Sequence, residues 1–145
     1  MESVLVYSMV RTHGVLAPLL DSDLRGARLT AAQFNALLVL RAAEAAGLNM
    51  GELGKRLVVT KSNVTGLVDR LERRGWVVRC AEADRRAIRV RITPEGRKLL
   101  KEVEPSHAKA LADLTSSLTQ KEKTEMTRML TKLRRALRER RKGDA

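Results

Sequence analysis

Between residues 49 and 93 the spacing of apolar residues changes from a helical repeat to a strand repeat, and this change restricts the possible folds more than any other feature. Residues 61–74 carry apolar side chains at helical spacing, whereas residues 87–92 alternate apolar residues with arginine. A polar segment at 81–86 separates this strand from an earlier one at 76–80. The pattern predicts a short helix, a longer helix and a β-hairpin, in this order.

Helix-start signals place the remaining elements. A hydroxyl or amide side chain followed three residues later by Glu or Gln forms a capping box, and this spacing occurs at Thr30, Asn49 and Thr119. Thr93 precedes Pro94, which favours another helix start. We therefore expect a mainly α fold with a small β-hairpin and six helices. The predicted helices cover about 3–24, 31–46, 50–57, 61–74, 94–114 and 120–141.

The chain carries a net charge of +12, and two segments hold the excess. Residues 55–91 contain eleven Lys and Arg against four Asp and Glu, and residues 121–145 contain ten against four. A basic excess of this size indicates a polyanionic partner. The second segment either adds phosphate contacts or is the solvated end of a helix, and the solvated end is the more frequent use of such a run.

The outer face of the predicted helix 61–74 has the residue types that read DNA. Val64, Leu67, Val68 and Leu71 face inward, which leaves small polar residues followed by arginines outside. Small side chains let the backbone approach the major groove, Ser, Thr and Asn bond base edges, and Arg and Lys reach guanine or phosphate. A solvated amphipathic helix is the alternative. The predicted DNA contacts are Thr60, Lys61, Ser62, Asn63, Thr65, Gly66, Arg70 and Arg73.

The hairpin predicts a second DNA contact. Arg85 and Arg86 lie at its tip, and Arg89 lies in its second strand. An arginine on a protruding hairpin can enter the minor groove, where the negative potential is strongest. Asp84 disfavours phosphate contact and is interpreted as a brace that orients a neighbouring arginine. A generic charged turn is the alternative to this interpretation.

Apolar stripes follow the helices predicted at both ends of the chain. A helix bundle within one chain could bury these stripes. Because they are long and lie outside the predicted DNA-reading segment 49–93, we favour their burial against a second copy of the chain across a two-fold axis. We therefore expect a homodimer. The residues predicted at its interface are Leu5, Met9, Leu16, Leu114, Leu118, Met126, Leu130, Leu133 and Leu137.

Residue usage also indicates a compartment. Cys80 is the single cysteine, so no internal disulfide forms, in agreement with a reducing cytoplasm. We interpret Cys80 as a small apolar filler rather than a redox group. The apolar N-terminus is interpreted as a helix rather than a signal peptide or membrane span. His13 and His107 have no Asp, Glu or Cys cluster beside them in the sequence, so neither a metal nor another cofactor is predicted.

Other classes of protein fit less well. No Gly-rich phosphate loop, HExxH motif or nucleophile elbow occurs in the sequence, which argues against an enzyme. The three aromatic residues are too few for the base stacking that RNA-binding modules use. A non-specific architectural DNA-binding protein would suit the total charge. The small polar residues Ser62, Asn63 and Thr65 favour base reading instead.

Five motifs match one family: Thr30-x-x-Gln33-Phe34, Gly47-Leu48-x-Met50-x-Glu52-Leu53, the run from Val59 to Gly75, Asp84-Arg85-Arg86 and Thr93-Pro94-x-Gly96. In these motifs, and over about residues 30–115, the chain resembles the MarR family of bacterial transcriptional regulators. It departs from the family pattern at Gly54, where alanine is usual, and at the tip 81–84, which lacks a proline. The first departure should loosen the short helix by up to about 1 kcal/mol.

The resemblance implies a single domain, 1–145, with a winged helix-turn-helix core at about 30–93. Dimerisation helices at about 3–24 and 94–141 would flank this core. The helix 61–74 would be the recognition helix, and Arg86, oriented by Asp84, would enter the minor groove. The protein would repress transcription by binding a palindromic operator as a homodimer.

The resemblance also implies a small anionic or aromatic effector, bound between the dimerisation helices and the winged helix-turn-helix core. The candidate lining residues are Tyr7, Arg11, His13, Phe34 and Leu38.

Overall fold

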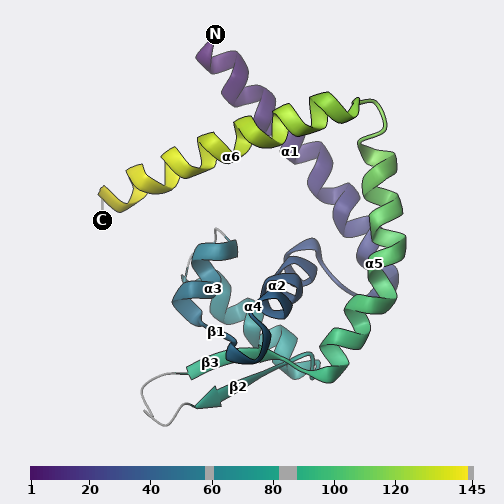
Figure 1. Ribbon diagram of the computed structural model, residues 1–145, viewed down its shortest axis with the longest axis vertical. Coiled ribbons are helices and arrows are strands. Elements are labelled where there is room, and N and C mark those ends of the chain that lie inside the picture. Colours follow the sequence, from purple (N-terminus) through teal and green to yellow (C-terminus); the bar gives the residue numbers. More distant parts are fainter. Residues whose placement is uncertain (58–60, 82–87, 144–145) are drawn as a thin grey trace. The chain divides into compact units, whose positions relative to one another are not determined.

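The computed structural model describes residues 1–57, 61–81 and 88–143, apart from the side chains of 61, 62 and 141–143. It divides into two compact units, Met1–His107 and Ala108–Ala145. The helices are α1 (Glu2–Leu24), α2 (Ala31–Ala42), α3 (Met50–Leu57), α4 (Lys61–Arg73), α5 (Pro94–Leu114) and α6 (Gln120–Gly143) (Figure 1). The strands are β1 (Leu48–Asn49), β2 (Val77–Ala81) and β3 (Ile88–Ile92). The predicted class, mainly α with a small antiparallel wing, is confirmed.

The capping boxes form as the sequence predicts. The Gln33 backbone N–H donates to Thr30 Oγ1 at 3.2 Å, and the Thr30 N–H donates to Gln33 Oε1 at 3.0 Å. The Glu52 N–H donates to Asn49 Oδ1 at 2.8 Å, and the Asn49 N–H donates to Glu52 Oε2 at 2.9 Å. Thr119 and Glu122 make the same pair of bonds. Each box satisfies first-turn amides that a helix leaves without partners.

One helix is shorter than predicted and one strand was not predicted. The helix expected over 31–46 ends at Ala42, because Glu44 takes a left-handed φ of +53° and begins a short 3₁₀ turn. This turn directs the chain to β1, where Leu48 pairs with Val90. A strand of two residues shows no periodicity, so the sequence pattern did not indicate it.

The sheet forms the base of the wing. Its strand order is β1-β3-β2, and both pairings are antiparallel. Val77 pairs with Ile92, and Arg79 pairs with Val90. Val90 and Ile92 are buried, as the predicted alternation requires, whereas Ile88 at the outer end of β3 is exposed. The alternation therefore holds where the hairpin meets the core.

The core of the first unit receives its largest contribution from leucines. Val64, Leu67, Val68 and Leu71 are all buried, which confirms the predicted inner face of α4. Burial of each such side chain stabilises the fold by roughly 1.5–3 kcal/mol. The remaining face of α4 is therefore held outward. Other side chains that are fully buried in this core include Leu24, Leu37, Leu40, Leu53 and Leu100.

A histidine–aspartate pair joins α5 to the end of α1. His107 Nδ1 lies 2.5 Å from Asp23 Oδ2, and the His107 ring contacts Phe34 edge-on, with 4.5 Å between ring centroids. The sequence shows no acidic cluster beside His107, and the structure brings it a single acidic partner from 84 residues away. Among residues 1–57, 61–81 and 88–143, no group of three or more His, Cys, Asp or Glu side chains could hold a metal.

An ion pair joins α2 to α5. The Arg41 Nη1 and Nη2 atoms lie 2.7 Å and 2.5 Å from the two Glu104 carboxylate oxygens. The hydrogen bond from Arg41 lowers the pKa of the Glu104 carboxyl, against the smaller opposing effect of burial. A carboxyl with a lowered pKa stabilises the folded state above its unfolded pKa, about 4.3, and this contribution disappears as the pH falls through the folded value.

We expect Glu104→Gln to lower the free energy of unfolding at pH 7 by up to about 1 kcal/mol, since solvent screens this half-exposed pair. The difference from the wild type should shrink as the pH falls below about 4. Urea unfolding at pH 7, 5 and 3 measures it. Glu102→Gln, at an exposed position of the same helix, is the control and should resemble the wild type at each pH. An equal loss of unfolding free energy at pH 7 and pH 3 would contradict a stabilising ion pair between Arg41 and Glu104.

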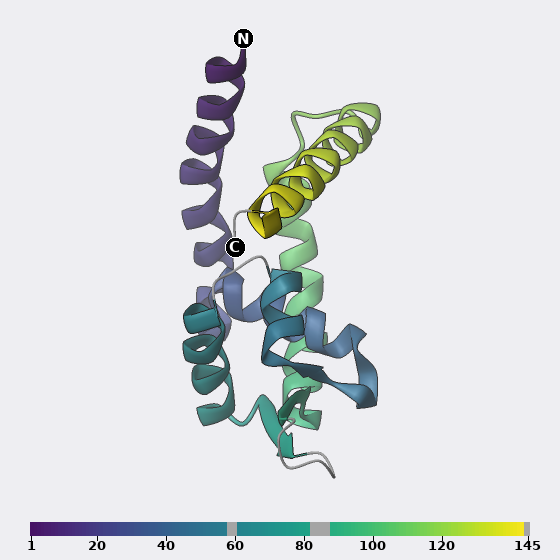
Figure 2. The same ribbon diagram turned by 90° about the vertical axis from the view of Figure 1, so that its left-hand side faces the viewer.

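Helix α1 leaves most of its apolar side chains exposed. It projects beyond the rest of the first unit (Figure 2). By length and composition alone the segment Glu2–Ala27 could cross a membrane, so the sequence prediction that no segment suits a membrane span was too strict. Such a single helix is weak evidence for a membrane, because a core helix of a soluble protein and a signal sequence can have the same length and composition.

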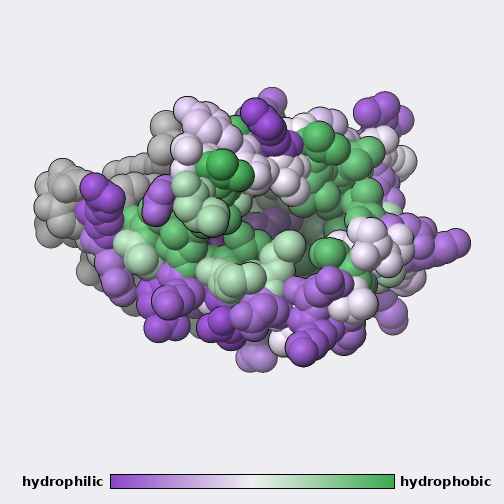
Figure 3. All heavy atoms as spheres, turned by 90° about the horizontal axis from the view of Figure 1, so that it is seen from above, coloured by the Kyte–Doolittle hydropathy of each residue, from purple (hydrophilic) through white to green (hydrophobic). Residues whose placement is uncertain are grey.

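The second unit contains no buried residue between 108 and 140. Apolar side chains nevertheless recur along α6, and Met126, Leu130 and Leu137 are 45%, 40% and 56% exposed. Figure 3 shows apolar side chains lying open on the surface of the molecule, among hydrophilic ones. Exposed apolar stripes of this length mark surfaces that bind a partner.

Candidate nucleic-acid interface

The outward face of α4 presents short polar side chains and then arginines. Asn63, Thr65, Asp69, Arg70 and Arg73 are exposed, and the four apolar residues of the same helix are buried. The helix therefore shows the division into an inner and an outer face that the sequence predicts. Of the other predicted contacts on this helix, Gly66 is half-buried, Thr60 lies outside the described residues, and the side chains of Lys61 and Ser62 are not described.

Gly66 leaves room for an arginine on this face. A Cβ at Gly66 would lie 3.5 Å from Arg70 Nη1, so the Arg70 guanidinium folds back over the glycine. The next turn holds Arg73, whose Nε donates to the Asp69 carbonyl oxygen at 3.3 Å. Two arginines, the residue type that reaches guanine or phosphate, thus lie on successive turns of the exposed face.

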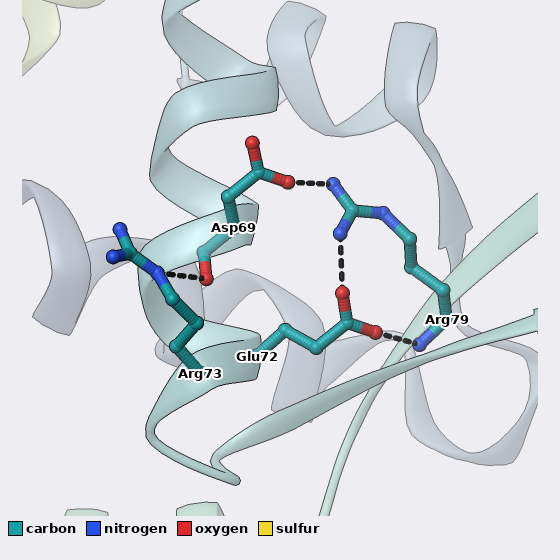
Figure 4. Close-up of polar contacts among 4 residues, drawn as sticks. All are labelled: Asp69, Glu72, Arg73 and Arg79. Carbon is teal, nitrogen blue, oxygen red and sulfur yellow. Dashed lines mark hydrogen bonds and ion pairs between the residues drawn. The ribbon is translucent and has the colours of Figure 1, made fainter.

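Arg79 on β2 binds two carboxylates of α4 (Figure 4). Its Nη2 donates to Asp69 Oδ1 at 2.6 Å, and its Nη1 donates to Glu72 Oε2. Its backbone N–H donates to Glu72 Oε1 at 3.0 Å. Figure 4 shows the guanidinium reaching both carboxylates from the strand while Arg73 points to the other side of the helix. The first strand of the wing is therefore tied to the predicted recognition helix.

Burial by itself would lower the pKa of Arg79, but the hydrogen bonds to Asp69 and Glu72 outweigh it and raise the pKa above the usual value. The guanidinium is therefore a permanent cation in this contact. Its side chain is only 25% exposed. A charged group this sheltered from water interacts more strongly with its partners than a surface ion pair does.

The second strand of the wing is tied to a different helix. Arg89 on β3 donates from Nη1 to the Gly47 carbonyl oxygen at 3.1 Å and lies 3.4 Å from Glu52 Oε2 of α3. Arg89 therefore braces the base of the wing, a role that the sequence pattern did not indicate. Its predicted contact with DNA stays a prediction, as do those of Asp84, Arg85 and Arg86, which lie outside the described residues.

Arg74 fixes the end of α4. Its Nη2 donates to the Arg28 carbonyl oxygen at 3.0 Å, and its guanidinium lies 4.7 Å from the centroid of the Trp76 ring. Sequence reasoning missed Arg74 and Arg79 as interface-shaping residues. Both act through partners that are distant in sequence or on another element, and no local periodicity reveals such pairs.

The predicted effector residues are not gathered in one place by any described contact. Tyr7, Arg11 and His13 are exposed on α1, whereas Phe34 is buried in the core against His107. Leu38 is half-buried and packs on the same core. His107 was not among the predicted residues, and it is the side chain that contacts Phe34.

A short helix, an outward-facing second helix and a braced three-stranded wing together define a winged helix-turn-helix. Comparison with known proteins supports this class. The model of the MarR family matches residues 29–87. The chain is 30% identical over 120 residues to the HTH-type transcriptional regulator PecS of Dickeya dadantii, which covers 81% of this chain and 72% of PecS.

Two further proteins are similar. Over 101 residues the chain is 34% identical to the transcriptional repressor MprA of Escherichia coli, but this match spans only 57% of MprA and 69% of this chain. The fold matches that of Sco3205, a MarR family transcriptional regulator from Streptomyces coelicolor whose crystal structure is a complex with DNA. That match has a TM-score of 0.86 at 27% identity and covers 94% of this chain and 90% of Sco3205.

The chain belongs to the MarR family of winged helix-turn-helix transcriptional regulators. Members of this family regulate transcription and are not enzymes, so the predictions of the family and of a non-enzymatic function are confirmed.

Proposed function

We propose that the protein is a homodimeric repressor that binds a palindromic operator. Each α4 enters the major groove of one half-site, and each wing reaches the neighbouring minor groove. A regulator of this kind acts on DNA in the cytoplasm. The observation that carries the proposal is the outer face of α4, where Asn63, Thr65, Arg70 and Arg73 are exposed while the inner face is buried. The fold similarity to a regulator in complex with DNA supports it.

The exposed apolar side chains support the dimer. Residues 108–140 hold no buried side chain although α6 carries an apolar stripe, and Leu5 and Leu16 of α1 are exposed as well. A second copy of the chain would bury these surfaces, and each Å² of apolar surface removed from water would stabilise the dimer by about 25 cal/mol. A two-fold axis would also fix the distance between two recognition helices, which palindrome reading requires. The other residues predicted at the dimer interface include Leu114, which is exposed, and Met9, Leu118 and Leu133, which are half-buried.

Selection of bound sequences from a random DNA pool tests the proposal. We expect enrichment of a palindrome whose half-sites are about one helical turn apart. The runner-up function, a non-specific architectural DNA-binding protein, would retain DNA with a steep salt dependence and enrich no motif. Enrichment of no motif would therefore reject the regulator in favour of that alternative.

Replacement of Asn63 by alanine should relax the sequence preference at one position of each half-site. A lost base contact costs about 1–3 kcal/mol of discrimination, roughly a 5- to 150-fold change at that position. Affinities for the operator and for single-base variants of it measure this change. Lys98→Ala, at an exposed position of α5, is the control and should leave the ranking of the variants intact. An unchanged ranking for Asn63→Ala would remove Asn63 from the reading face.

A small anionic or aromatic effector is a separate part of the proposal. Arg11 on α1 would supply the charge, Phe34 and Leu38 on α2 the apolar wall, and Tyr7 and His13 on α1 the rest of the lining. A panel of aromatic carboxylates, added to the complex of protein and operator, tests for release of the DNA. Release that Arg11→Ala abolishes would support this lining, and release that is unaffected by the substitution would contradict it.

A further inference from the structure

We propose that Arg79 is a positioning residue for operator recognition: it holds α4 and the wing in one relative register and keeps two carboxylates of α4 off the DNA. This inference rests on the proposed DNA-binding function and deepens it. Arg79 is not among the predicted DNA contacts, and it acts through Asp69 and Glu72.

The geometry of the contact supports a fixed register. The Arg79 guanidinium uses separate nitrogens for the two carboxylates, and its backbone N–H holds Glu72 as well. Asp69 and Glu72 lie on neighbouring turns of α4, so the three contacts restrain both rotation of the helix and its shift along its axis. A planar guanidinium with two partners gives directional restraint that a point charge does not.

The other wing strand adds an independent restraint. Arg89 ties β3 to the end of the 3₁₀ turn at Gly47 and to Glu52 of α3. Strands β2 and β3 are paired from Val77–Ile92 outward to Ala81–Ile88. Each strand is therefore fastened to a different helix of the helix-turn-helix, and loss of the Arg79 side chain would remove its bonds from β2 to Asp69 and Glu72 while β3 stays bound to α3.

Charge gives the second half of the argument. Asp69 lies three residues after Gly66 and four before Arg73, in the middle of the exposed face of α4. Its side chain is 49% exposed, so without Arg79 its full negative charge would face the phosphates. Like charges brought together at an interface oppose binding. Pairing with Arg79 neutralises this carboxylate where the recognition helix meets DNA.

The test compares binding to the duplex enriched by the wild type and to a scrambled duplex of the same length. Arg79→Gln should weaken binding to the enriched duplex at least tenfold and reduce the ratio of the two affinities at least threefold. Arg97→Gln, which also removes one positive charge at an exposed position of α5, should leave that ratio unchanged. Asp69→Asn added to Arg79→Gln should restore at least a third of the logarithmic loss in affinity, because the uncompensated carboxylate is then gone.

Circular dichroism establishes whether Arg79→Gln is folded. If it is not, Arg79→Lys decides, since this variant keeps the charge but loses the two-pronged contact. The inference then requires a reduced affinity ratio for Arg79→Lys, and a wild-type ratio overturns it. An equal effect of Arg79→Gln and Arg97→Gln, or no recovery with Asp69→Asn, overturns it as well. A wild-type protein that does not distinguish the two duplexes would instead contradict the proposed function.

Discussion

Leu130→Glu on α6 should convert the protein into a monomer and weaken operator binding by at least about a hundredfold. Leu130 is 40% exposed in the single chain and lies within the apolar stripe formed by Met126, Leu133 and Leu137. A carboxylate placed there would have to be buried without a partner when two chains meet, which strongly opposes association. In a monomer each winged helix-turn-helix binds one half-site alone. Linked binding of two sites commonly raises the overall affinity by 10²- to 10⁴-fold, and the monomer loses this gain.

Sedimentation velocity and fluorescence anisotropy with the full operator measure the two effects. Thr124→Glu is the matched control, because it introduces the same charge at an exposed position on the opposite face of α6. The control should remain dimeric with nearly wild-type affinity. A Leu130→Glu protein that stays dimeric and binds normally would place the dimer interface elsewhere.

Gly96→Ala should destabilise the fold by about 3 kcal/mol, at the upper end of the cost of overfilling a packed site. A Cβ at Gly96 would lie 2.3 Å from the Trp76 carbonyl oxygen and 2.9 Å from Ile92 Cγ1. The oxygen belongs to backbone that is itself fixed, because it accepts the Thr93 N–H at 3.0 Å. The first turn of α5 therefore approaches the base of the wing more closely than any side chain permits.

Thermal and urea unfolding measure the change in stability. Gly26→Ala serves as the control, since a Cβ at Gly26 would meet no heavy atom within 4 Å. It should leave the free energy of unfolding within about 0.5 kcal/mol of the wild type, as surface substitutions usually do. Equal stability of the two variants would mean that α5 can move away from the turn at little cost.

The local elements were largely predictable. Capping boxes at Thr30, Asn49 and Thr119 specify helix starts through bonds that span three residues, so the sequence contains both partners. The apolar spacing of α4 likewise predicts which face is buried, because it repeats within one helix. The end of α2 and strand β1 were missed. Both depend on Glu44 turning left-handed so that Leu48 can reach Val90, a partner more than 40 residues away.

The candidate site was predicted in its residue types and only partly in its arrangement. Asn63, Thr65, Arg70 and Arg73 are exposed on α4 as expected. The predicted role of Arg89 did not include its bonds to Gly47 and Glu52. The sequence pattern also gave no reason to separate Arg79 from the other basic residues between 55 and 91.

By itself the sequence determined the order of the helices and the wing, the buried face of α4 and the family, because each depends on spacing along a few consecutive turns or on a contiguous motif. Only the tertiary structure decided which polar and charged side chains meet. Arg79 reaches Asp69 and Glu72, Arg41 reaches Glu104, and His107 reaches Asp23. An ion pair needs two groups within about 4 Å in space, and a chain with 29 basic and 17 acidic residues offers far more combinations than folding allows.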